Sequence, residues 1–293
     1  MLKIAFDTEG DALLLRLLKM FDTSWLKILT FFAVWAFIWL PIALIVSRLI
    51  DWQPSKTLMP KQKLILLASL YILSPGILGW KLKAENLSFA SLGLSVDFSI
   101  LVSILLGLIL AIASLILIFS LESVFNLVDW HWQNSPQLLT LLLPILLLSI
   151  LISLVEESIF RGYVFSTLLI EHNYWYAAIA SSIIFALLHL VWSQKETIPQ
   201  IPGLWLMGMI LVAARLVDNG SIGLALGLHA GWIWGLTTID SARLLTYNRE
   251  NSWVTGINQQ PLAGVAGIFC MIFTGLILWL TANNSTVGWA SLG

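Results

Sequence analysis

Two adjacent glutamates and an arginine end a long apolar stretch of this sequence. Residues 155–165 read VEESIFRGYVF, and residues 130–155 contain no Asp, Glu, Lys or Arg. A stretch of that length can span a bilayer. A charged side chain near the centre of a bilayer costs roughly 3 kcal/mol or more, so charges at that depth usually have a partner or a chemical task. Glu156, Glu157 and Arg161 are therefore the first candidate site residues.

The spacing of these charges divides them into a pair and a single carboxylate. Glu157 and Arg161 are four residues apart, which in a helix places them on one face, with the glutamate in the favourable N-terminal position for an ion pair. Glu156 is turned about 100° away from that face. One interpretation is that the pair braces the helix while Glu156 faces a wet cavity. The other is that all three are interfacial charges that close a membrane span.

Two histidines lie inside other apolar runs. His189 ends the sequence FALLH, one helical turn after Phe185 and on the same face. His229 lies within SIGLALGLHAGWIWGL, where glycines recur every four residues from Gly223 to Gly235. Such a smooth ridge lets a neighbouring helix approach closely, and His229 lies roughly opposite it. A single intramembrane histidine is usually a structural residue, but two of them on two helices, together with a glutamate, favour a functional site.

One glutamate and two histidines can act in two related ways. Glu156, His189 and His229 can hold a Zn²⁺ ion with an open position for water, as catalytic zinc sites do with two histidines and one glutamate. Alternatively, Glu156 and one histidine deprotonate a water molecule directly while the other histidine stabilises the oxyanion. Both arrangements would hydrolyse an acyl bond, and the residue types leave both open, with zinc as the only cofactor considered.

The three stretches resemble the motifs of a known family. EESIFRG looks like the EExxxR motif of the CAAX prenyl endopeptidase and bacteriocin-processing family (CPBP, also called Abi), FALLH is similar to its FxxxH motif, and HAGW resembles the start of its HxxxN/D motif. The resemblance covers about residues 140–240, in the family's order. It implies a helical intramembrane protease that cleaves a peptide or a membrane-anchored protein. Glu156 and His189 would activate the water, and His229 would contribute to the oxyanion site or to a metal.

The third motif departs from the family pattern at its last position. The family usually has Asn or Asp four residues after the histidine, whereas this sequence has Ile233, which offers no polar atom. The loss of one oxyanion donor costs about 10²–10³ in rate where it has been measured. Either Trp232 or Thr237 supplies a substitute, or the protein is slow, or it no longer cleaves. The alternative function is therefore a non-catalytic membrane scaffold or regulator of the same family.

Composition places these residues in a polytopic membrane protein. The chain has 293 residues, of which 59% are hydrophobic and 11% charged, whereas a soluble domain is typically about 25% charged. A net charge of −1 argues against nucleic acid as a partner. A transporter using Glu156 as a proton site is disfavoured, because the sequence shows no repeated half. We expect a multi-pass integral membrane protein, in the cell membrane, with lipid and a peptide or membrane-anchored protein as its partners.

The elements that must position the site are apolar runs of about the length that crosses a bilayer. We expect an all-α fold with about eight transmembrane helices, and with the catalytic cavity inside the helical bundle. The runs are 28–47, 64–80, 98–121, 133–155, 174–194, 197–214, 219–239 and 262–282.

The runs suggest three parts of the chain. Residues 1–132 would hold an amphipathic segment, at 12–20, and the first three spans. Residues 133–240 would form the catalytic core, and residues 241–293 a loop and the last span.

Overall fold

The computed structural model describes residues 23–53, 58–95, 97–248 and 252–283, and this part of the chain is almost entirely helical. The amphipathic segment expected at 12–20 lies outside the described residues. The expected all-α class is confirmed, with one small sheet added. The chain forms two compact units, residues 1–81 with 167–172, and residues 82–166 with 173–293. The three-part division expected from the sequence stays a prediction.

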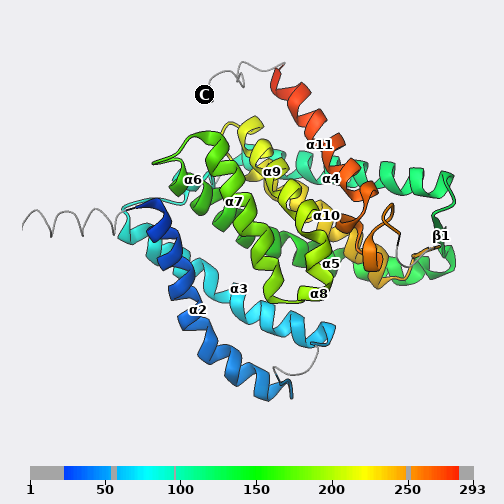
Figure 1. The fold of residues 1–293 in the computed structure, drawn as a ribbon, viewed down its shortest axis with the longest axis horizontal. Coiled ribbons are helices and arrows are strands. Elements are labelled where there is room, and N and C mark those ends of the chain that lie inside the picture. Colours follow the sequence, from blue (N-terminus) through cyan, green and yellow to red (C-terminus); the bar gives the residue numbers. More distant parts are fainter. Residues whose placement is uncertain (1–22, 54–57, 96, 249–251, 284–293) are drawn as a thin grey trace, which may run out of the picture. The chain divides into compact units, whose positions relative to one another are not determined.

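The elements follow one another along the chain as shown in Figure 1. In chain order they are α2 (Ser24–Leu49), α3 (Pro60–Ala84), η1 (Ala90–Leu92), α4 (Phe98–Val124), β1 (Val128–Trp130), η2 (Trp132–Asn134), α5 (Ser135–Glu157), η3 (Ser158–Val164), α6 (Phe165–Leu168), α7 (Tyr174–Leu188), η4 (His189–Val191), α8 (Gln194–Thr197), η5 (Ile198–Gln200), α9 (Ile201–Val217), α10 (Gly223–Ser241), β2 (Leu245–Tyr247), η6 (Ile257–Gln259), η7 (Pro261–Ala263) and α11 (Val265–Asn283).

Helices α2 and α3 build the first unit. Two indole N–H groups of α2 connect them, because Trp35 donates to the carbonyl of Leu70 at 3.2 Å and Trp39 donates to Ser69 Oγ at 3.0 Å. Helix α3 contains Pro75 and continues through it. The apolar run predicted at 64–80 therefore extends by several residues at both ends.

Seven helices among the described residues are long and apolar enough to cross a membrane, so the protein is a multi-pass integral membrane protein. The sequence predicted about eight. The run at 219–239 does form a helix, α10, but it is not among the seven. Its glycines, threonines and His229 make it less apolar than the seven helices that qualify. Its sides are instead covered by protein, since it packs mainly against α4 and α5.

The glycine ridge of α10 packs against α4, as the spacing predicts. A Cβ atom added to Gly227 would lie 2.0 Å from the carbonyl oxygen of Ile104, and one added to Gly231 would lie 2.5 Å from the Cβ of Ala111. These contacts leave no room for any larger residue. The close approach fixes the rotation of α10 and therefore the direction in which His229 points.

The helix that begins at Ser135 changes its winding just after the two glutamates. Residues Ser158–Val164 form η3, a π-helical segment, before the α-helix resumes at Phe165. The sequence predicted a regular α-helix here, because the apolar pattern does not distinguish the two windings. π-Helical turns are rare and occur frequently at functional sites.

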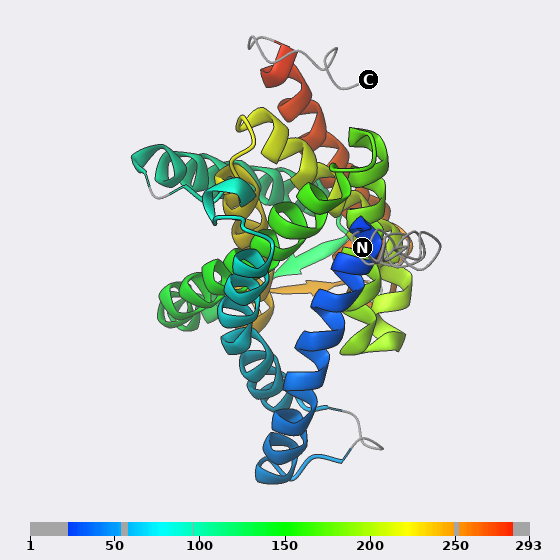
Figure 2. The same ribbon diagram turned by 90° about the vertical axis from the view of Figure 1, so that its left-hand side faces the viewer.

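A two-stranded sheet that the sequence did not predict joins two connections. Strand β1, between α4 and α5, pairs antiparallel with β2, between α10 and α11, so that Val128 lies opposite Tyr247 and Trp130 opposite Leu245. Figure 2 shows the two strands as adjacent arrows. Each strand has only three residues, too few for an alternating pattern to be recognised in the sequence.

Candidate active site

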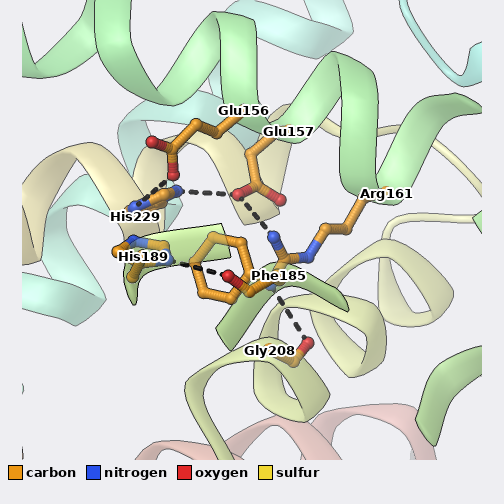
Figure 3. A network of polar contacts seen from close by, with 7 residues as sticks. All are labelled: Glu156, Glu157, Arg161, Phe185, His189, Gly208 and His229. Carbon is orange, nitrogen blue, oxygen red and sulfur yellow. Dashed lines mark hydrogen bonds and ion pairs between the residues drawn. The ribbon is translucent and has the colours of Figure 1, made fainter. Parts of the chain in front are cut away.

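Four helical segments of the second unit bring the motif residues together (Figure 3). Glu156 and Glu157 are the last two residues of α5, and Arg161 follows in η3. Helix α7 ends just before His189, which begins η4, and His229 lies in the middle of α10. The structure thus collects residues separated by more than 70 positions in the sequence at one place, as the three motifs predict.

His229 lies between the two glutamates. Its Nδ1 is 2.7 Å from Glu157 Oε1, and its Nε2 is 3.7 Å from Glu156 Oε2. A carboxylate only accepts, so Nδ1 donates its proton to Glu157 and the ring orientation is fixed. The sequence placed the two carboxylates on different faces of one helix. A single imidazole reaches both because its two nitrogens point in different directions.

Arg161 is fully buried and makes three kinds of contact. Its Nη1 lies 3.2 Å from Glu157 Oε1, its Nη2 donates to the carbonyl of Gly208 on α9 at 3.3 Å, and its guanidinium lies 4.3 Å from the ring centroid of Phe185. The ion pair expected from the four-residue spacing is therefore present. Glu157 thus holds Arg161 and His229 through the same oxygen. Its predicted bracing role stays a prediction, although the contacts with α7 and α9 favour it.

Phe185, the phenylalanine of the second motif, packs beside both imidazoles of the cluster. The ring of Phe185 lies 4.6 Å from the ring of His189 and 5.9 Å from that of His229, centroid to centroid. Its carbonyl accepts a hydrogen bond of 2.8 Å from His189 Nδ1. This bond places the remaining proton-exchanging atom of His189 at Nε2. Figure 3 shows both imidazoles on the same side of Phe185, with Arg161 on the other.

The cluster has a buried part and a more accessible part. The side chain of Glu157 is 0% exposed, whereas that of Glu156 is 12% exposed, and His189 is only half-buried. A general base must reach a water molecule and its substrate. Glu156 and His189 are better placed for this than Glu157, which is enclosed by Arg161 and His229.

The side chains of the cluster do not form a three-ligand metal site. Among the residues that the structure describes, no group of three or more His, Cys, Asp or Glu side chains is arranged to hold a metal ion. Nδ1 of His189 and Nδ1 of His229 each donate to a protein oxygen, which leaves both Nε2 atoms available, as in many metal-bound histidines. The grouping of the described side chains nevertheless does not match the zinc site that the sequence left open, and the proposed reaction uses Glu156 and the histidines directly.

Comparison with known proteins agrees with this geometry. The model of a family described as type II CAAX prenyl endopeptidase Rce1-like matches residues 136–235. The resemblance predicted from the motifs is confirmed. This Rce1-like region includes every residue of the glutamate–histidine cluster, and it leaves α2, α3, α4 and α11 outside. Searches of curated proteins and of solved structures gave no match.

Trp232, one proposed substitute for the missing amide at position 233, already has a hydrogen-bond partner. The indole N–H of Trp232 donates to Ser114 Oγ on α4 at 3.1 Å, and the ring is buried. It is therefore engaged with a neighbouring helix in this structure. Ile233 is half-buried on α10, one turn after His229. Thr237, one further turn along, stays a predicted substitute.

Arg215, which the sequence did not single out, forms hydrogen bonds to the π-helical turn. Arg215, at the end of α9, donates to the carbonyl of Arg161, to Ser166 Oγ at 2.9 Å and to the carbonyl of Gly220 at 2.9 Å. Its only signal in the sequence is a cation inside the apolar run LVAARLV. Because it donates to a backbone carbonyl of η3, Arg215 stabilises the turn that presents the glutamates and Arg161.

A large cavity of the second unit is separate from this cluster. It has a volume of about 720 Å³ and lies between α4, α5 and α10, with Leu138 and Leu142 on one side and Trp234 on another. Its α10 wall begins beyond His229, and its α5 wall ends well before Glu156. The expected catalytic cavity around the motif residues therefore stays a prediction.

Proposed function

We propose that the protein is an intramembrane endopeptidase that hydrolyses a peptide bond in a membrane-associated protein or peptide. The observation that carries the proposal is the contact of His229 with both glutamates inside an Rce1-like region. A purely interfacial set of charges would have no reason to gather around two imidazoles from other helices. The family description also favours a prenylated C-terminal segment as the substrate class.

The proposed reaction begins with the activation of water. Glu156, assisted by Nε2 of His189, takes one proton from a water molecule, and the resulting hydroxide attacks the peptide carbonyl carbon. The carbonyl oxygen becomes an oxyanion, which the Nε2–H of a doubly protonated His229 stabilises while its Nδ1–H stays hydrogen-bonded to Glu157. Glu156 then returns the proton to the amide nitrogen as the C–N bond breaks. The products are a carboxylate and an amine, so one water molecule is consumed for each bond cleaved.

Glu157 and Arg161 support this chemistry without contacting the substrate. Glu157 Oε1 fixes the tautomer of His229, and Arg161 compensates the buried negative charge. Two carboxylates in one buried site would repel each other strongly if no cation lay beside them. The pair therefore allows Glu156 to remain available as a base.

A second candidate function is favoured by one observation. Ile233 stands where the family has an amide, and the nearby Trp232 N–H is bound to Ser114. A protein with this cluster but without an adequate oxyanion site would act as a membrane scaffold or regulator. The two functions differ in whether the purified protein cleaves anything.

The test compares two glutamate variants in the full-length protein. Purified wild type is incubated in detergent with a panel of membrane-anchored peptides, with and without a prenyl group at the C-terminus. Glu156→Gln should abolish cleavage with little change in melting temperature. Glu122→Gln is the matched control, because Glu122 is another buried glutamate, on α4, outside the cluster. Equal cleavage by the wild type and Glu156→Gln, or no cleavage of any peptide by the wild type, would contradict the peptidase proposal.

A further inference from the structure

Two serines precede the glutamates on α5, and only one of their hydroxyls is hydrogen-bonded within the described part of the chain. Ser149 and Ser153 are one turn apart and both 0% exposed. Ser149 Oγ donates to the carbonyl of Ile145 at 2.7 Å, the usual solution for a serine within a helix. Ser153 Oγ is buried and has no hydrogen-bond partner within the described part of the chain. A buried hydroxyl without a partner is costly, so it calls for an explanation.

A second buried oxygen without a partner lies on the same face of the helix. Glu157 follows Ser153 by four residues, and its Oε1 holds Arg161 and His229. Its Oε2 is buried and has no hydrogen-bond partner among the described residues. Side chains four residues apart on a helix have Cβ atoms about 5–6 Å from each other. Side chains that are neighbours in this way can share one bridging water molecule, and a buried water needs two to four hydrogen-bond partners.

We propose that Ser153 Oγ and Glu157 Oε2 form a binding site for one buried water molecule, next to Glu156. Ser153 precedes Glu156 by three residues and so lies on the adjoining part of the same face. The catalytic use of this site rests on the proposed function. Each cleavage consumes one water, which a site beside Glu156 would supply. Ser153 is then a positioning residue that keeps a water molecule within reach of Glu156.

The matched pair of variants is Ser153→Ala and Ser149→Ala in the full-length protein. Both remove one fully buried hydroxyl from the same helix. If Ser153 binds the water, removing its hydroxyl leaves that water held by Glu157 Oε2 alone. The melting temperature should then fall further in Ser153→Ala than in Ser149→Ala. If the hydroxyl of Ser153 has no partner at all, removing it should raise the melting temperature, because the cost of burying it disappears. The sign of the change in melting temperature of Ser153→Ala therefore distinguishes the two cases.

Direct observation of the water provides a readout that does not depend on activity. An experimental structure that resolves ordered water should show one water molecule within hydrogen-bond distance of both Ser153 Oγ and Glu157 Oε2. The same water should be absent or displaced in Ser153→Ala and present in Ser149→Ala. A wild-type structure with no water at this place, together with a raised melting temperature in Ser153→Ala, would overturn the inference.

Kinetics then test whether the water serves the reaction. Ser153→Ala should lower kcat about tenfold, the equivalent of one lost hydrogen bond, with KM nearly unchanged, while Ser149→Ala should keep both. Wild-type cleavage that Ser153→Ala leaves intact would show that the peptidase proposal stands and the water-supplying role fails. If no peptide is cleaved, the peptidase proposal fails by itself. In that protein, an observed water at Ser153 and Glu157 would still support the binding site, and its absence would reject it.

Discussion

His229 Nδ1 lies 2.7 Å from Glu157 Oε1, and the same oxygen lies 3.2 Å from Arg161 Nη1. One buried carboxylate oxygen thus connects a histidine of the third motif to the arginine of the first. The two motifs are separated along the chain by the whole of α7 and α9, so this contact depends on the tertiary fold. Glu157 is therefore more than a brace within its own helix.

Glu157→Gln should destabilise the protein strongly. The substitution leaves the guanidinium of Arg161 buried without its carboxylate partner, and the loss of one partner from a buried ion pair costs about 3–5 kcal/mol. Denaturant or thermal unfolding in detergent measures the change. Glu156→Gln is the control, because the Glu156 side chain, 12% exposed, is less enclosed than that of Glu157 and should tolerate the amide. A larger loss of stability in Glu156→Gln than in Glu157→Gln would show that the two roles are reversed.

Arg161→Lys should also be destabilising, although it keeps the charge. A lysine ammonium cannot form the same planar fork to Glu157 and the Gly208 carbonyl, nor stack on the Phe185 ring. We expect a loss of about 1.5–3 kcal/mol, the usual value for a hydrogen bond to a charged group. Arg48→Lys, at an exposed position near the end of α2, should have little effect in the same unfolding assay. Similar small effects in both variants would refute the three-contact role of Arg161.

Gly227→Ala should disturb the packing of α10 on α4. The added Cβ would lie 2.0 Å from the Ile104 carbonyl oxygen, so the helices must separate, which costs about 1–3 kcal/mol or more. Displacement of His229 should lower any cleavage activity together with the melting temperature. Gly76→Ala is the control, because no atom lies within 4 Å of its added Cβ. That variant should gain about 0.5–1 kcal/mol from the higher helix propensity of alanine, and a comparable loss in both variants would contradict the packing argument.

Ile233→Asn should distinguish an enzyme with a missing donor from a protein without catalytic function. An amide on the His229 face of α10 can donate to the oxyanion, so activity should rise about tenfold or more. In a dry site the amide would find no partner, and the helix would lose about 1–3 kcal/mol with no gain in activity. Activity and melting temperature are therefore measured on the same variant. Strong wild-type cleavage that Ile233→Asn does not improve would show that another donor, such as Thr237, already fills this role.

Local patterns in the sequence predicted the features that depend on neighbours along one helix. The apolar runs became helices, the glycines every four residues became a packing ridge, and Glu157 and Arg161 paired across one turn. The π-helical winding of η3 was missed, because residues favouring an α-helix and a π-helix share the same apolar pattern. Of the about eight predicted spans, seven are long and apolar enough in the described residues, and α10, formed by the run at 219–239, is less apolar than these.

Contacts between distant parts of the chain required the structure. No spacing rule connects Arg215 with the carbonyl of Arg161, or His229 with Glu157, since each pair lies more than 50 residues apart in the sequence. The three motifs predicted that their residues would meet. They did not predict which atoms would face one another, because that depends on how far each helix is rotated about its axis.

The composition of α10 bears on how the protein is made. A segment that carries His229 and four regularly spaced glycines, and that is not among the seven strongly apolar helices, gains little free energy from entering lipid alone. Its favourable interactions are those with α4 and α5, which precede it in the chain and are synthesised first. The helix that completes the glutamate–histidine cluster is therefore expected to enter the membrane only when these two neighbours are in place. Assembly of the site then becomes a late step of biogenesis, which prevents the cluster from forming in an incomplete chain.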